Sequence, residues 1–149
     1  MFRHRFLDCV ALLALAAFFN LACGSSHRQI QSVSVSPAAA NARDYPGGKI
    51  PFVATGHYSK APTTVTPLNA RWGVASVQAA NGVETFGLAN GAVSVDTNGL
   101  AQCTSGASGN YAVAAWADLP VSVPLPCAVN AFGAPTCYTV LGIAHLTCP

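Results

Sequence analysis

Cysteine is the residue type in this chain with the clearest chemistry. Four of the six cysteines lie in the last third of the 149 residues, and none of their spacings is the Cys-x-x-Cys of a zinc site. An even number of cysteines in an exported domain is typical of disulfides, and four cysteines allow three pairings. We favour Cys127 with Cys137, which would close a short loop, and Cys103 with Cys148, which would tie the last strand to an inner one. We expect no metal and no cofactor.

The other two cysteines lie at the N-terminus, where residues 1–22 have the layout of a secretory signal peptide. Arg3 and Arg5 give a basic start, an unbroken apolar run covers residues 10–19, and small and polar residues follow it. That run is half of the roughly 20 apolar residues that a membrane-spanning helix needs. We therefore expect a leader that is removed rather than a retained anchor helix.

The end of this leader resembles a bacterial lipobox, the short motif whose cysteine receives a lipid. The matching residues are Leu21-Ala22-Cys23, whereas Asn20 departs from the aliphatic residue that is usual there. The resemblance implies that residues 1–22 are a lipoprotein signal peptide and that Cys23 is lipidated. The membrane would then be a partner of the protein through the anchor at Cys23.

The residue after this cysteine bears on the destination. Gly24 is not the Asp that such proteins use for inner-membrane retention, which favours the outer membrane or cell surface. Two or more acyl chains hold a protein stably at a membrane. The alternative is ordinary cleavage after Gly24, which would release a soluble secreted protein.

The rest of the chain has the length of one domain and few charges. After residue 22, five basic and four acidic residues give a net charge of +1. Charged residues are 8% of the whole chain, against about 25% in an average protein. No basic patch is present, so we expect no nucleic-acid partner. Ser, Thr, Asn, Gly and Pro supply the polarity, which suits strands and turns better than helices.

Alternating apolar and polar residues predict short strands throughout residues 33–149, after a polar tether at residues 23–32. The expected strands cover residues 33–37, 49–58, 68–72, 77–80, 83–86, 93–95, 100–103, 110–117 and 138–148. No window has helical periodicity. We therefore predict an all-β fold, an antiparallel β-sandwich of about seven strands or more.

Two turn motifs and two irregular segments interrupt these strands. Asn81-Gly82 is typical of a two-residue hairpin. Asp96 to Gly99 faintly resembles the opening of a calcium loop but lacks the later ligands, so we interpret it as a turn. Residues 73–91 around the hairpin and the proline-rich residues 119–136 have no overall shape that the sequence predicts.

The order of the motifs resembles the bacterial immunoglobulin-like domain of group 2. The matching motifs are Val33-x-Val35-x-Pro37, Phe52-x-Ala54-Thr55-Gly56-x-Tyr58, Trp72, Val93-x-Val95-Asp96-x-x-Gly99-Leu100-Ala101, Gly109-x-Tyr111-x-Val113-x-Ala115 and Ala144-x-Leu146-Thr147. The resemblance covers residues 30–149 and looks most like a single-domain lipoprotein version with a cysteine-rich final hairpin. Residues 73–90 are longer than the family's usual connection, and residues 119–136 are an insertion. It implies an Ig-like β-sandwich that serves as a structural or adhesive module at the cell surface and is not an enzyme.

Histidine is the other residue type that could do chemistry. His27 lies in the tether, and we place His57 and His145 on the outward faces of their strands. A Ser-His-Asp triad would need one of the latter two, but the chain has no Gly-x-Ser-x-Gly elbow. We therefore expect solvated strand histidines and no catalysis. A hydrolase, by contrast, would lose its turnover when His57 or His145 is replaced by Ala.

Aromatic residues could supply a binding face. Tyr45, Tyr58, Tyr138 and Trp116 are the candidates, although we favour the interpretation that they cover the core and the seam between the sheets. We expect Trp72 to be core.

The alternative to a structural or cell-adhesion role is binding of a carbohydrate or another envelope polysaccharide, or of another surface protein. The loops in residues 73–91 and 119–136 would form such a site. Specific, saturable binding that is lost on mutation of loop residues such as Phe86 or Phe132 would support this alternative.

Overall fold

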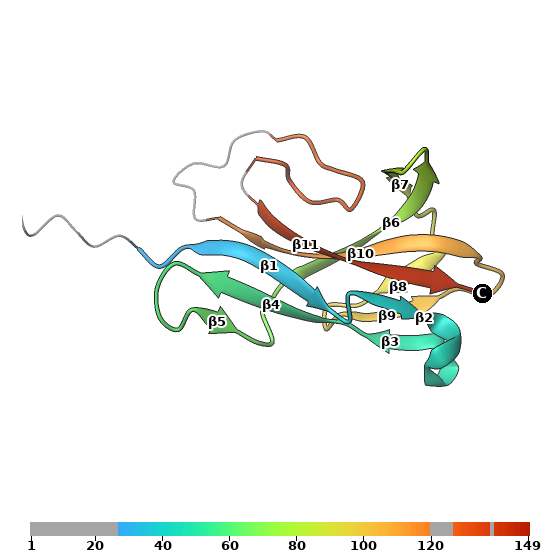
Figure 1. Ribbon diagram of the computed structural model, residues 1–149, viewed down its shortest axis with the longest axis horizontal. Helices are drawn as coiled ribbons and strands as arrows, with labels where there is room; N and C mark the ends of the chain where they lie inside the picture. Colours follow the sequence, from blue (N-terminus) through green and yellow to red (C-terminus); the bar gives the residue numbers. More distant parts are fainter. Residues whose placement is uncertain (1–26, 120–126, 138) are drawn as a thin grey trace, which may run out of the picture.

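The computed structural model describes residues 27–119, 127–137 and 139–149 (Figure 1). The elements within them are β1 (Ile30–Ser36), β2 (Ala39–Asn41), the 3-10 turns η1 (Ala42–Asp44) and η2 (Pro46–Gly48), β3 (Lys49–Pro51), β4 (Val53–Tyr58), β5 (Thr64–Val65), β6 (Arg71–Ala80), β7 (Val83–Leu88), β8 (Val93–Val95), β9 (Leu100–Cys103), β10 (Gly109–Asp118) and β11 (Thr139–Cys148). The prediction of an all-β fold is confirmed. The leader and Cys23 lie outside the described residues.

The strands form the two layers of a sandwich (Figure 1). One layer is a single sheet with the strand order β2-β11-β10-β6-β7, and the other combines two small sheets, β1-β4-β5 and β3-β9-β8. Neighbouring strands are antiparallel except at one edge, where β2 runs parallel to β11. The predicted sandwich is therefore confirmed, with more strands than expected and with one parallel pair.

The two small sheets form one layer because a single extended segment contributes one strand to each of them. Residues 49–58 were expected to be one strand, and their alternation does persist, with Ile50, Phe52 and Ala54 all buried. Phe52 divides the segment, however: β3 pairs with β9, while β4 pairs with β1. At the junction the Phe52 N–H donates to the carbonyl of Gly99 (2.9 Å), so its backbone donor stays satisfied where the pairing partner changes.

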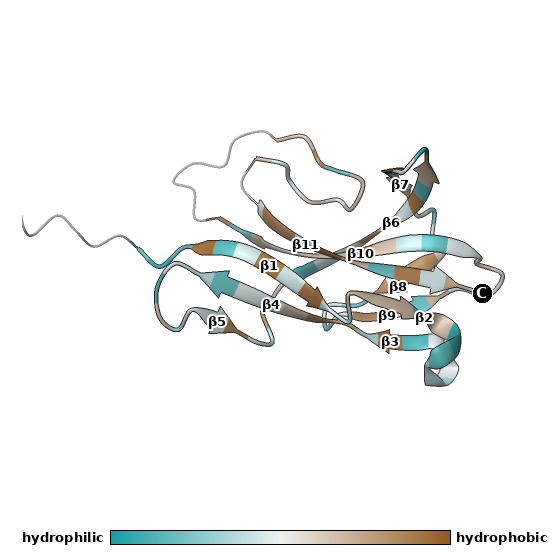
Figure 2. Ribbon diagram, in the orientation of Figure 1, coloured by the Kyte–Doolittle hydropathy of each residue, from teal (hydrophilic) through white to brown (hydrophobic). Residues whose placement is uncertain are grey.

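The core lies between the layers and also extends to the far side of the large sheet. Figure 2 shows hydrophobic bands alternating with hydrophilic ones along β1, which faces the five-stranded sheet. On β10 the inner residues Tyr111, Val113 and Ala115 belong to the main core. The outer face of β10 is buried as well, through Ala114 and Trp116 among others, in a second cluster. Burial of both faces implies that something covers the sheet from outside.

Several strand boundaries differ from the predicted ones. β1 begins at Ile30, which pairs with Tyr58, so the tether ends earlier than residue 32. Residues 71–80 form one continuous strand, β6, where two separate strands were expected, and β2 and β5 were not predicted. β6 stays continuous because β10 pairs with its first half and β7 with its second.

Both predicted turns are confirmed. Asn81 and Gly82 have φ angles of 54° and 76°, the positive values that a two-residue hairpin turn needs, and they join β6 to β7. Asp96 Oδ1 accepts hydrogen bonds from the backbone N–H groups of Asn98 (2.8 Å) and Leu100 (2.9 Å). That carboxylate oxygen is therefore used by its own turn.

Candidate functional site

The described part of the proline-rich segment, residues 127–137, folds into a small closed loop that we call the excursion. A disulfide joins Cys127 to Cys137 at its base, with their Cα atoms 6.0 Å apart, and Val129 forms an isolated bridge with Pro135. The Thr136 N–H and hydroxyl both bond to the carbonyl of Ala128, at 2.9 and 3.0 Å. The loop is therefore a structured unit and not the irregular segment that its prolines suggested.

Asn130 organises the tip of the excursion. Its Oδ1 accepts hydrogen bonds from the N–H groups of Phe132 and Ala134, both at 3.0 Å, and its carbonyl accepts one from Gly133 at 3.0 Å. This turn directs Phe132 and Ala134 toward the protein, where they are 8% and 0% exposed. An Asn side chain that bonds the backbone two and four residues later is a common way to fix such a turn.

The excursion covers the outer face of the five-stranded sheet. Its buried residues pack in the second cluster with Ala75, Ala112, Ala114 and Trp116 from β6 and β10. The three alanines leave room for a loop to lie on the strands. The excursion is thus the cover that the two-sided burial of β10 requires.

The β6–β7 hairpin rises from the same face (Figure 1). The rings of Phe86 in β7 and Phe132 in the excursion are 5.3 Å apart and tilted by 51°, within the range of favourable aromatic pairs. Glu84 Oε2 lies 3.9 Å from Nε2 of His145 in β11, although β6 and β10 separate their strands. Such a contact requires the hairpin to curl over the face of the sheet.

The two segments leave an apolar surface open to solvent. We call it the hairpin–excursion surface and define it by Glu84, Phe86 and Leu88 of β7 together with Phe132, which contacts Phe86. Phe86 is 39% exposed and Leu88 73%. Large apolar side chains exposed together are characteristic of interaction sites. Chemically, this surface can bind an apolar or extended partner.

The structure brings together two residues that the sequence had singled out for binding, Phe86 and Phe132, but it gives them different roles. Phe132 is buried, so it positions the excursion and cannot present its ring to a ligand. Phe86 keeps part of its ring free. Asn130 turns the side chain of Phe132 into the sheet, so any effect of Phe132 on binding would act through the position of the excursion and of Phe86.

The other candidate aromatic residues do not form a common face. Trp116 is buried beneath the excursion, and Tyr58 packs partly against the main core with the Arg28 guanidinium 3.6 Å from its ring centre. Tyr45 and Trp72 also pack against the main core. Tyr138 lies outside the described residues. The expectation that these residues cover the core is confirmed for Tyr45 and Tyr58, whereas Trp116 packs in the second cluster on the outer face of the sheet.

The histidines face outward as expected. His57 Nε2 lies 3.2 Å from the hydroxyl of Ser34, on the exposed side of β4 and β1. In the described part of the chain, Asp118 pairs with Arg71 (2.9 Å) and Glu84 lies beside His145 (3.9 Å), so neither carboxylate is at His57. Among the residues that the structure describes, no carboxylate therefore forms an ion pair with His57, as the Asp of a triad would.

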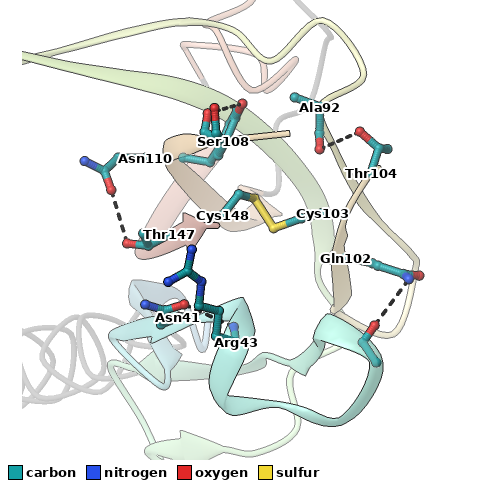
Figure 3. The surroundings of a disulfide bond; sticks show 12 residues. Asn41, Arg43, Ala92, Gln102, Cys103, Thr104, Ser108, Asn110, Thr147 and Cys148 are labelled. Carbon is teal, nitrogen blue, oxygen red and sulfur yellow. Dashed lines mark hydrogen bonds between the residues drawn. A yellow bond between two sulfur atoms is a disulfide. The ribbon is translucent and has the colours of Figure 1, made fainter. Parts of the chain in front are cut away.

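The second disulfide holds the end of the sandwich where the chain terminates. Cys103 in β9 and Cys148 in β11 are joined, with Cα atoms 5.9 Å apart, so this bond links the two layers (Figure 3). Beside it, Thr147 Oγ1 donates to Asn110 Oδ1 (3.1 Å), and Gln102 Nε2 donates to the Gly47 carbonyl (3.4 Å). The structure thus contains both pairings that the sequence favoured.

Two shallow hollows at this end were not predicted, and both are lined by Tyr45. One of about 460 Å³ also has Arg43, Thr104 and Ser105 in its lining. The other, of about 490 Å³, also has Asn41, Asp44, His145 and Thr147 in its lining. An aromatic ring between hydroxyl, amide and charged groups is suited to bind a polar ligand such as a sugar. No spacing in the sequence signals these hollows, because η1 and the ends of β9 and β11 meet only in the fold.

The described residues contain no group of three or more His, Cys, Asp or Glu that could hold a metal ion. In the same part of the chain, no helix has the length and apolar character needed to cross a bilayer. Comparison of the chain with protein-family models, with curated proteins and with solved structures gives no match.

Proposed function

We propose that this protein is an exported, non-catalytic Ig-like module of the cell surface, held to the membrane by a lipid on Cys23, with a structural or adhesive role. The observation that carries the proposal is the hairpin–excursion surface, in which two loop segments converge to expose Phe86 and Leu88. The two disulfides support an oxidising, extracellular location. The lipobox-like end of the leader supports the anchor.

The positions of the tether and of β7 along the long axis support a hairpin–excursion surface that faces away from the membrane. β1, which follows the tether, begins at one end of the long axis, and β7 and the C-terminus lie toward the other end (Figure 1). A lipid on Cys23 would hold the first end near the membrane. The β6–β7 hairpin would then be presented away from it, where an adhesive surface is useful.

The anchor is tested by expressing the full-length chain in an exporting bacterial host, as wild type and as Cys23→Ala. We expect the wild type to have the mass of a chain cut before Cys23 plus lipid, and to partition into detergent. Cys23→Ala should lose both properties. A wild-type protein that is water-soluble, unmodified and cut after Gly24 would overturn the anchor and make the module a released one.

The second candidate function is binding of an envelope polysaccharide, which the two hollows around Tyr45 favour. Screening the protein against a glycan array and against isolated cell-wall polymer tests it. Saturable binding that Tyr45→Ala abolishes and Tyr58→Ala preserves would support this function. Binding that depends on Phe86 instead would assign it to the hairpin–excursion surface.

A further inference from the structure

Most sheet edges among the described residues are short or covered. The edge strands β2, β3 and β8 have three residues each and β5 has two, while β1 packs against β11. β7 is the exception, with six residues from Val83 to Leu88 and no strand on its outer side within the described chain. An open edge offers a row of backbone N–H and C=O groups to another strand.

β7 also lacks the devices that usually protect an edge. Proteins block edges with proline, lysine or inward-pointing charge. β5, for comparison, is flanked by Pro62 and Pro67. β7 has no proline and no lysine, and its one charged residue, Glu84, is engaged with His145 over the face of the sheet. Val83 and Leu88 at its two ends are 62% and 73% exposed.

The hairpin turn decides which backbone groups are free. In a two-residue hairpin the residues flanking the turn, here Ala80 and Val83, form a hydrogen-bonded pair, and such pairs alternate along the strands. The N–H and C=O groups of Val83, Thr85 and Gly87 therefore point to β6. Those of Glu84, Phe86 and Leu88 point to the open edge.

We propose that β7 is a self-association site, at which a second copy of this chain adds its own β7 antiparallel, centred on Phe86. In this register Phe86 faces Phe86 of the second copy, and Glu84 faces Leu88 of the second copy. All three outward-pointing residues are then paired, and no like charges oppose each other. A register centred on Thr85 would leave the backbone groups of Leu88 without a partner strand residue.

Side chains agree with this register. Phe86 lies on the same face as Phe132, so the two copies would bring their Phe86–Phe132 pairs side by side across the junction. Cross-strand aromatic pairs are among the favourable contacts of antiparallel sheets. The arrangement is a two-fold one that uses the one long open edge found among the described strands of each copy, so it stops at a dimer. It does not depend on the lipid anchor or on an adhesive role.

The test uses matched charge substitutions at Leu88, whose exposure makes them harmless to the fold. The full chain carrying Cys9→Ala and Cys23→Ala, which removes both cysteines outside the two disulfides, is examined by sedimentation equilibrium, and circular dichroism checks that each variant is folded. We expect a monomer–dimer equilibrium for the parent. Leu88→Glu, which would face Glu84 of the second copy, should weaken dimerisation about tenfold, whereas Leu88→Lys should preserve or strengthen it.

Cysteine cross-linking tests the register itself. Phe86→Cys should form a symmetric disulfide dimer, because facing residues of paired strands lie within reach of a disulfide. Thr85→Cys, its neighbour, should not. A parent that stays monomeric up to about 1 mM would overturn the proposal. Equal effects of Leu88→Glu and Leu88→Lys, or faster cross-linking at position 85, would also overturn it.

Discussion

The carbonyl oxygen of Phe132 occupies the space that a β-carbon at Gly73 would need. Gly73 lies in β6 on the outer face of the sheet. The closest side chain to the position of such a β-carbon is the ring of Trp116. The excursion therefore rests directly on the backbone of β6. This contact fixes the position of Phe132, and Phe132 in turn supports Phe86 and the hairpin–excursion surface.

Gly73→Ala is expected to dislodge the excursion. The added methyl group would overlap a backbone carbonyl that cannot rotate away, and overpacking of this kind costs about 1–3 kcal/mol of the free energy of unfolding. Urea denaturation measures it. Gly87→Ala is the matched control, because there the added carbon meets only the mobile hydroxyl of Ser76. Equal stability of Gly73→Ala and wild type would contradict the docking of Phe132 on β6.

Asn130 is expected to hold the excursion through its side-chain oxygen. Asn130→Ala removes two hydrogen bonds to backbone N–H groups and should lower the free energy of unfolding by about 1–3 kcal/mol. Asn130→Asp keeps an acceptor in the same place and should lie within about 0.5 kcal/mol of wild type. Thermal unfolding of the three proteins compares them. If Asp and Ala variants were equally destabilised, the oxygen would not be the group that matters.

The sequence predicts those parts of the fold in which local chemistry and long-range packing agree. β11 alternates between buried and exposed residues from Gly142 to Cys148, and Asn81-Gly82 determines its turn by backbone preference alone. The division at Phe52 is different. The alternation of buried residues runs through it unchanged, and only the pairing partner changes, which no local pattern encodes.

Contacts between distant segments also determine the roles of the site residues, so the sequence names these residues without predicting their roles. Phe86 and Phe132 are noticeable because they are the aromatic residues of the two segments whose shape the sequence does not predict, so they could be named. Their roles follow from contacts across the chain: Gly73 admits the excursion, and Asn130 turns Phe132 inward. The hollows at Tyr45 likewise arise where η1 meets the ends of β9 and β11, segments far apart in the sequence.

Phe86 and Phe132 are expected to stabilise each other beyond their individual packing. Phe132→Ala should cost about 3 kcal/mol of the free energy of unfolding because the ring is buried. Phe86→Ala should cost about 1 kcal/mol because its ring is partly exposed. The double variant should lose less free energy of unfolding than the two single variants lose together. The difference should be about 0.5–1.5 kcal/mol, which is the coupling energy of an aromatic pair. Strict additivity in denaturant titrations would show that the rings do not interact.

The two disulfides are expected to stabilise different parts of the molecule. The bond between Cys103 and Cys148 closes 45 residues, and that between Cys127 and Cys137 closes 10. By loop-closure entropy, replacing both cysteines of a pair by Ala should lower the free energy of unfolding by about 4 kcal/mol for the first pair and about 3 kcal/mol for the second. Chemical denaturation of the two double variants measures the difference.

Trp116 fluorescence separates the two effects, because this ring lies in the cluster beneath the excursion and away from the Cys103–Cys148 bond. In a Trp72→Phe background, loss of the Cys127–Cys137 bond should free the excursion and shift Trp116 emission to longer wavelength in the folded protein. Loss of the other bond should leave that emission unchanged, since the excursion keeps its own closure. Identical spectra for both variants would show that the excursion is held by its contacts with β6 and β10 alone.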